Sequence, residues 1–251
     1  LWMTDSPLEQ VYVQKNASYA LLDRNIGATK AYPEGGDDWK ETVGTFYQWG
    51  RKDPFIVGKY NVRYSKFSSI AESISRPTYF THNHYTWIEE LSNKAWKYDQ
   101  KTIYDPCPVG YRMPVSNIFP DLYAMNSNDF GLYYMYDGDA EAWYPYSSYI
   151  NYYADYQEDQ KTGFVWTVRN DYSFIDFKYE EENQWIEGNE RGHAFPVRCM
   201  KDDGHVDISY PRVDVVSLEN ITEERLVYPA ELKHISIHRQ VGLKWICVIY
   251  S

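Results

Sequence analysis

The sequence is short of cysteine, of long apolar runs and of basic residues, and each shortage excludes a class of protein. Its 251 residues include three cysteines, Cys107, Cys199 and Cys247, which lack the close spacing of zinc ligands. No window of about 18 apolar residues occurs, so the sequence predicts no membrane-spanning segment. The formal net charge of −11 argues against nucleic acid and anionic lipid as partners, because both bind basic patches.

Sequence motifs of catalysis are missing as well. The chain contains no Gly-x-Ser-x-Gly, HExxH or P-loop motif. Adjacent acidic residues such as Glu89 and Glu90 could suggest a glycosidase, but acidic pairs are frequent in a chain with 36 aspartates and glutamates. The sequence therefore favours a non-enzymatic protein that needs no cofactor.

The sequence leaves two alternatives for the bonding state of Cys107 and Cys199. In an oxidising compartment they could form a disulfide, which would stabilise the fold by about 4–5 kcal/mol in the chain-entropy model. In a reducing compartment they would be two buried thiols that behave as small apolar side chains. The odd number of cysteines leaves at least one free thiol in either case.

Aromatic residues, in contrast, are abundant, with 26 tyrosines and 9 tryptophans. These rings combine a large apolar area with a polar group, so they suit wet binding surfaces as well as cores. The pattern of apolar residues, turn residues and helix caps predicts the order of elements along the chain. The predicted elements are two short strands within 1–30, a helix over 86–97, a helix over 116–125, a long loop over 126–160, strands within 163–200 and a β-prone segment over 205–251.

Four sequence blocks, LDRNIGAT, GTFYQWGRKDPF, DPCPVGYRMP and PVRCMKD, follow one another in a fixed order. They occupy residues 22–29, 44–55, 105–114 and 196–202. Together they resemble the FISUMP family (Fibrobacter succinogenes major paralogous domain) over residues 20–203. The family's Tyr-Trp-Ser-Ser block is matched only loosely, by VWTV at residues 165–168.

The resemblance implies an α+β, C-type-lectin-like fold with paired terminal strands, two helices and long irregular loops. It also implies secretion and display on the cell surface of Bacteroidetes, at fimbrial tips or in large lipoproteins. Residues 1–19 would then be a linker or entry strand from an upstream domain, and residues 204–251 part of a second, Ig-like or BACON-like domain. On this basis we expect a glycan-binding adhesin, or alternatively a structural module that docks a host or pilus protein.

The charged and aromatic residues of the four blocks are expected to hold the fold together. Arginine forks bind carboxylates well, so the block arginines are predicted to bind buried aspartates. Trp49 and Phe55 are predicted to fill the core. The arginines concerned are Arg24, Arg51, Arg112 and Arg198, and the aspartates are Asp23, Asp53 and Asp105.

The predicted binding site lies in the aromatic segment 126–160, since ligands of C-type-lectin-like folds bind in the long loop region. Ring faces can stack on sugar C–H surfaces, while carboxylates and amides bind hydroxyl groups. The alternative is that these rings pack the loops onto one another. The predicted ligand-binding residues are Tyr136, Asp137, Asp139, Glu141, Trp143, Tyr144, Tyr146 and Asn151, with Trp166 from outside the segment.

Two groups of residues could suggest a metal site. Asp137, Asp139 and Glu141 alternate like the start of a calcium loop, but Ala142 stands where an EF-hand needs glycine. Calcium is therefore a weak alternative to no metal. His82 and His84 would share one face of a strand, but no third zinc ligand is evident, and a solvated pair is favoured.

Overall fold

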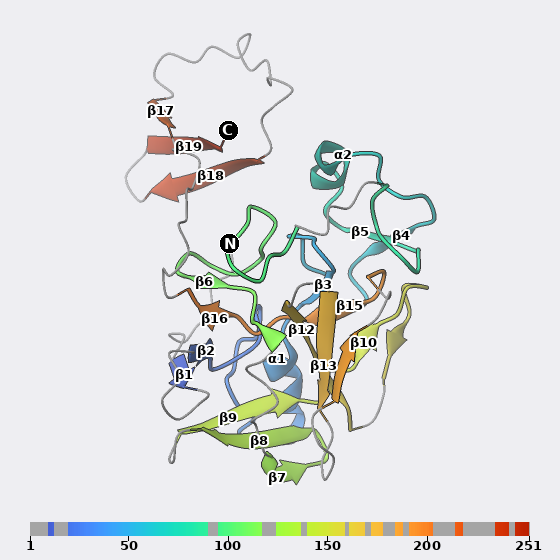
Figure 1. The fold of residues 1–251 in the computed structure, drawn as a ribbon, viewed down its shortest axis with the longest axis vertical. Helices are drawn as coiled ribbons and strands as arrows, with labels where there is room; N and C mark the ends of the chain where they lie inside the picture. The colour runs from blue at the N-terminus through green and yellow to red at the C-terminus, as the bar shows by residue number, and fades with distance from the viewer. Residues whose placement is uncertain are drawn as a thin grey trace. The chain divides into compact units, whose positions relative to one another are not determined.

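The computed structural model of the chain describes two units, residues 1–206 and 207–251, which are considered separately (Figure 1). The predicted boundary after residue 203 lies close to this division. The residues described are 10–12, 20–89, 95–116, 124–136, 140–158, 161–168, 172–177, 184–187, 191–202, 214–217, 234–240 and 244–250.

The first unit is built mainly from strands, with short helices, as expected of a mixed or β-rich fold. Its helical segments are the 3-10 turn η1 (Gly36–Trp39), α1 (Lys40–Val43) and α2 (Ile70–Ile74). Within the described ranges, no helix is long and apolar enough to cross a membrane. The strands are β1 (Gln10–Tyr12), β2 (Ala20–Leu22), β3 (Phe46–Gln48), β4 (Asn61–Arg63), β5 (Tyr79–Thr81), β6 (Tyr111–Arg112), β7 (Ala124–Asn128), β8 (Gly131–Tyr136), β9 (Ala140–Pro145), β10 (Tyr149–Ile150), β11 (Tyr156–Gln157), β12 (Gly163–Val168), β13 (Tyr172–Phe177), β14 (Gln184–Glu187), β15 (Ala194–Pro196) and β16 (Met200–Lys201).

Strand β2, near the start of this unit, lies beside the last strand, β16, in the sheet β1-β2-β16-β6. Met200 pairs antiparallel with Leu21, and the N–H of Leu22 donates to the carbonyl of Cys199 at 2.9 Å. A second sheet, β11-β10-β15-β3, joins the motif strand β3 to the hairpin β10–β11. The predicted pairing of terminal strands is thus present, and it connects distant parts of the sequence.

Three further sheets complete the unit. Strands β7-β8-β9 and β12-β13-β14 form antiparallel meanders, and β4 pairs parallel with β5. Strand β9 lies against α1, where Nε1 of Trp143 donates to Oγ1 of Thr42 at 2.9 Å. All six residues of β12 are buried, which explains why its sequence shows no alternation of apolar and polar residues.

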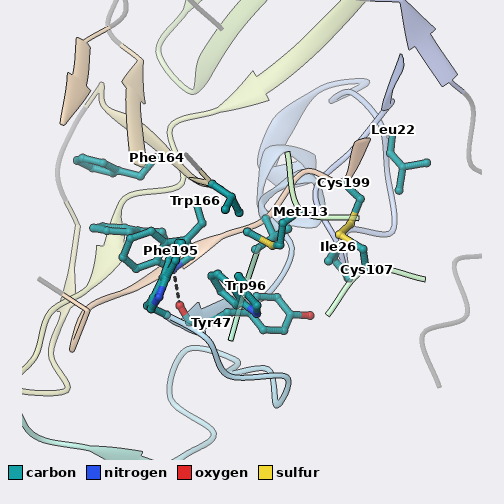
Figure 2. Close-up of a cluster of buried hydrophobic side chains, with 13 residues drawn as sticks. Leu22, Ile26, Tyr47, Trp96, Cys107, Met113, Phe164, Trp166, Phe195 and Cys199 are labelled. Atoms are coloured by element: carbon teal, nitrogen blue, oxygen red, sulfur yellow. Dashed lines mark hydrogen bonds between the residues drawn. A yellow bond between two sulfur atoms is a disulfide. The ribbon is translucent and has the colours of Figure 1, made fainter. Parts of the chain in front are cut away.

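The main core is aromatic (Figure 2). The ring of Trp49 meets the edges of Trp96 and Trp166 at centroid distances of 4.7 and 5.4 Å. Nε1 of Trp166 donates to the backbone carbonyl of Tyr47 at 2.6 Å, so the buried indole has a polar partner. Trp49 and Phe55 are both buried, which confirms their predicted core positions.

A disulfide joins Cys107 to Cys199 in this core, with the Cα atoms 5.8 Å apart (Figure 2). The bond fixes the segment before β6 to the segment before β16. Asp105 supports the same turn, because its carboxylate accepts from the N–H groups of Cys107 and Met113, each at 2.8 Å. Of the two alternatives for the cysteines, the structure has the disulfide.

The motif arginines are buried, but only two of them bind the predicted aspartates. Nε of Arg24 donates to Asp23 at 2.9 Å, and Nε of Arg51 lies 3.3 Å from Asp53. Arg112 donates to a backbone carbonyl at 2.6 Å and lies 3.7 Å from the buried carboxylate of Asp202, which was not among the predicted aspartates. Arg198 donates to the side-chain amide oxygen of Asn25 at 3.1 Å, so an amide takes the place of a carboxylate there.

The helix predicted over 86–97 is wrong for the residues described there. Ile88 forms a parallel bridge with Phe67, and the residues from 95 to 97 are not helical. Nε1 of Trp87 donates to the carbonyl of Trp49 at 2.7 Å. Burial of two tryptophans, Trp87 and Trp96, therefore overrides the helical spacing that the apolar residues suggested.

The predictions over 116–160 also need correction. Ala124 and Met125, the expected end of a helix, lie in β7, and the expected loop contains β8 to β11. A register shift between Ala124 and Asn126 interrupts the alternation of β7. Tyrosine suits either face of a strand, so the sequence of a tyrosine-rich hairpin shows little alternation of apolar and polar residues.

The second unit contains a three-stranded antiparallel sheet of order β17-β19-β18. Its strands are β17 (Asp214–Ser217), β18 (His234–Gln240) and β19 (Lys244–Tyr250). The β-prone character predicted for 205–251 holds for these three segments. Their assignment to an Ig-like or BACON-like domain stays a prediction.

Candidate functional site

A pocket opens beside the hairpin β10–β11, within the segment in which the sequence predicted the binding site. Its cavity volume is about 310 Å³, which lies at the lower end of the range for small-molecule sites. The lining combines aromatic rings with charged groups. The lining residues are Trp39, Asp129, Phe130, Tyr146, Ser148, Tyr156, Glu158 and Lys161.

One wall of the pocket is a stacked pair of rings. Trp39 ends η1, and Phe130 lies in the turn between β7 and β8. Their ring centroids are 5.3 Å apart and their planes differ by 9°. The N–H of Tyr146 donates to the carbonyl of Phe130 at 2.7 Å and fixes the turn. Because Phe130 is 39% exposed, the stacked pair gives the pocket an apolar side that solvent can reach.

Tyr156 supplies a half-buried hydroxyl group to the pocket. Its ring meets Phe46 edge-on at 5.9 Å, and its hydroxyl donates to the carbonyl of Ser147 at 3.0 Å. Burial, and then the charge of Glu158, raises the pKa of Tyr156 to about 12. The hydroxyl therefore stays protonated at physiological pH.

The rim of the pocket is charged. Nζ of Lys161 lies 3.6 Å from the carboxylate of Asp129, and both side chains are largely exposed. Glu158 is exposed as well. Exposed ion pairs add little to stability, so these groups can turn towards a ligand at little cost to the fold. The rim offers two carboxylates and one ammonium group for binding hydroxyl groups.

The backbone around the pocket is unusual. Among the residues described, the non-glycine residues with positive φ are Ser148 (53°), Ala154 (70°) and Lys161 (74°). Two of these three line the pocket, and the third lies in the turn of the β10–β11 hairpin. Such conformations are costly for L-residues and concentrate at functional sites. This clustering supports the pocket as a site rather than a packing defect.

Four of the predicted ligand-binding residues are buried, which corrects the prediction for three of them. Trp143 and Tyr144 pack inside the unit, with the guanidinium of Arg198 3.8 Å from the centre of the Tyr144 ring. Trp166 belongs to the aromatic core (Figure 2). None of these three rings presents a face to solvent. Tyr146 is also buried, but it lines the pocket.

The other predicted residues have different positions. Tyr136 ends β8, and Glu141 lies in β9 opposite Met135. Asp137 and Asp139 lie outside the described residues. The calcium alternative, which depends on them, therefore stays a prediction. Asn151 is half-buried, and its amide oxygen accepts from two backbone N–H groups of its own turn, at 2.9 and 3.0 Å. It therefore shapes the turn.

Sequence reasoning missed most of the lining. Trp39, Phe130, Glu158 and Lys161 are not among the residues predicted from the sequence. Trp39 and Phe130 are far apart in the sequence, so no local spacing predicts that they stack. The available signal was an aromatic residue inside a turn-rich segment, Asp37 to Lys40 for one and Asp129 to Gly131 for the other.

The chemistry of the pocket is suited to binding. Stacked rings, a neutral hydroxyl and exposed charges are groups that position a polar ligand with apolar faces. Within the described ranges, no three histidine, cysteine, aspartate or glutamate side chains are grouped to hold a metal ion. Comparison with protein-family models, curated proteins and solved structures gave no match to this chain.

Proposed function

We propose that residues 20–203 form a non-enzymatic, extracellular carbohydrate-binding module, an adhesin of the FISUMP type with a C-type-lectin-like fold. The single observation that carries the proposal is the pocket with the stacked Trp39–Phe130 wall and the exposed charged rim. A pyranose ring has an apolar C–H face and equatorial hydroxyl groups, which match this combination. The pairing of β2 with β16 and the four sequence blocks support the fold assignment.

The Cys107–Cys199 disulfide supports display outside the cell, since disulfides persist in oxidising compartments. The net charge of −11 is consistent with a partner other than nucleic acid. Surface display and attachment to a fimbria follow from the sequence resemblance alone.

The test is a glycan array probed with the full chain, the Lys161→Gly variant and a Lys59→Ala control. Glycine accepts the positive φ at position 161, so removing this side chain should not lower the thermal midpoint. Lys59 is exposed and lies outside the pocket. We expect wild type and Lys59→Ala to bind the same glycans and Lys161→Gly to bind them weakly.

Two outcomes would count against the proposal. Binding that is equal in all three proteins would place the site elsewhere on the chain. A folded wild type that binds no glycan but binds an unglycosylated host or pilus protein would favour the docking alternative.

A further inference from the structure

Six rings from three loops form a continuous row on the surface of the first unit. The row, in order, is Tyr64, His82, Tyr153, Tyr152, His84 and Tyr85. Successive ring centroids are 5.2, 5.1, 4.1, 4.6 and 4.8 Å apart. None of the six lines the pocket described above. We call this feature the ring row.

The ends and the middle of the ring row are exposed. Tyr64, Tyr153 and Tyr85 have 79%, 52% and 58% of their surface accessible, while the three rings between them are half-buried. Exposed apolar groups are common one at a time, but a connected series of this length on a small protein indicates an interaction surface. The half-buried rings act as supports for the exposed tyrosines.

The loops that carry the row are held in place by polar contacts. The side-chain oxygen of Asn83 accepts from the N–H groups of Tyr85 and Thr86 at 3.1 and 3.2 Å. The N–H of Gly192 donates to the carbonyl of His84 at 3.1 Å. A Cβ at Gly192 would lie 1.7 Å from the carbonyl oxygen of Asn83, so this close approach requires glycine.

The opposite loop is fixed in a similar way. Asn151 holds the turn of Tyr152 and Tyr153 through the two backbone bonds given above, and the two tyrosine hydroxyls are 2.9 Å apart. The hydroxyl of Tyr60 donates to the carbonyl of Ala154 at 2.8 Å. Rings that are already positioned lose little conformational entropy when a ligand binds.

We propose that the ring row is a second binding surface, which takes an extended oligosaccharide chain along the exposed tyrosines. This inference rests on the proposed function and extends it from a single sugar residue to a chain. The members are tyrosines and histidines, so the row combines aromatic rings with O–H and N–H groups. Sugar C–H faces and hydroxyl groups fit both features.

A proline-rich peptide fits the row less well. Such peptides place their side chains in grooves between aromatic rings. Here adjacent ring centroids are only 4.1 to 5.2 Å apart and adjacent planes are inclined by 41° to 73°, so neighbouring rings lie against one another. A ligand that lies on ring faces is therefore favoured over one that inserts between them.

The hairpin β10–β11 connects the ring row to the pocket. Its turn carries Tyr152 and Tyr153, and its second strand carries Tyr156 of the pocket, followed by Glu158. One short element thus contributes to both sites.

The experiment is calorimetric titration of the full chain with cello-, xylo-, manno- and chitohexaose and with the matching disaccharides. The variants are Tyr153→Ala and Tyr85→Ala, with Tyr153→Phe as the ring-retaining control and Tyr32→Ala as an exposed tyrosine outside the row. We expect each alanine variant in the row to weaken hexasaccharide binding about three- to tenfold and to leave disaccharide binding unchanged. Both controls should bind as wild type, and all variants should keep the wild-type thermal midpoint.

Each result separates this inference from the proposed function. If Lys161→Gly loses binding while the row variants bind hexasaccharides as wild type, the ring row is overturned and the pocket stands. If the row variants lose hexasaccharide binding and Lys161→Gly does not, the ring row stands without the pocket. If the folded wild type binds none of these saccharides, both are overturned.

Discussion

The core and the ring row are built from the same kind of side chain, yet they serve different ends. In the core, Trp49 contacts Trp96 and Trp166 at centroid distances of 4.7 and 5.4 Å, and all three are buried. In the ring row the distances are similar, but Tyr64 and Tyr153 are exposed. Ring contacts therefore do not distinguish a core from a binding surface. The exposure of the rings does, since the core rings are buried while Tyr64, Tyr153 and Tyr85 are exposed.

The largest expected effect is a loss of stability when the core loses its disulfide. Replacing both Cys107 and Cys199 by alanine should lower the free energy of unfolding by about 4–5 kcal/mol, because the bond closes a loop of 92 residues. Urea unfolding of the variant and of chemically reduced wild type, each compared with oxidised wild type, measures this effect. A loss below about 1 kcal/mol in both would show that the aromatic core holds without the bond.

Trp166→Ala should cost about 4 kcal/mol, since it removes a buried indole together with its hydrogen bond to Tyr47. The same urea titration gives the value. Trp166→Phe is the matched control and should retain part of the packing. An alanine variant as stable as wild type would mean that the core rings are no more structural than the surface rings.

His193 lies between the two regions, with its ring 5.9 Å from Phe195 of the core and 5.2 Å from Tyr152 of the row. Burial, and then the charge of His84, lowers the pKa of His193 to about 4. The folded state therefore disfavours the proton, and stability should fall as the pH falls from the ordinary histidine pKa of about 6.5 towards 4. We expect a loss on the order of 3 kcal/mol from this group.

Urea unfolding between pH 7 and pH 4 measures that slope. His193→Phe should flatten it, because phenylalanine has no proton to bind. If the free energy of unfolding depends on pH equally in the variant and in wild type, other groups cause the acid sensitivity. His193 would then not link the core to the ring row.

The smallest effect on stability is expected in the ring row. Tyr153→Ala should change the free energy of unfolding by less than about 0.5 kcal/mol, because the side chain is 52% exposed. Thermal unfolding beside Trp166→Ala gives the direct contrast. A loss of stability comparable to that of Trp166→Ala would show that the ring row helps to hold the fold together.

The scaffold could be predicted from the sequence better than the site could. The motif blocks predicted Trp49 and Phe55 in the core, because large rings are most often buried. The Cys107–Cys199 disulfide was one of two alternatives, and the structure decides between them. The pocket depends on contacts such as Trp39 with Phe130, which join segments far apart in the chain. Of the predicted ligand residues, Tyr146 lines the pocket, whereas Trp143, which is also buried, packs against Thr42 inside the unit. No local sequence pattern separates the two positions.

The pairing of β2 with β16 has a consequence for a module under mechanical load. The strands are antiparallel, so a pull between residues 20 and 201 opens their hydrogen bonds one after another. On the side of β16 the opening soon reaches Cys199, and the disulfide then passes the force directly to Cys107. Residues 108–198, which contain β10–β11 and most of the pocket lining, stay out of the stretched path. Tension can thus unravel the start of the unit, which carries Trp39 of the pocket wall, while the other pocket residues lie in the segment that is not stretched.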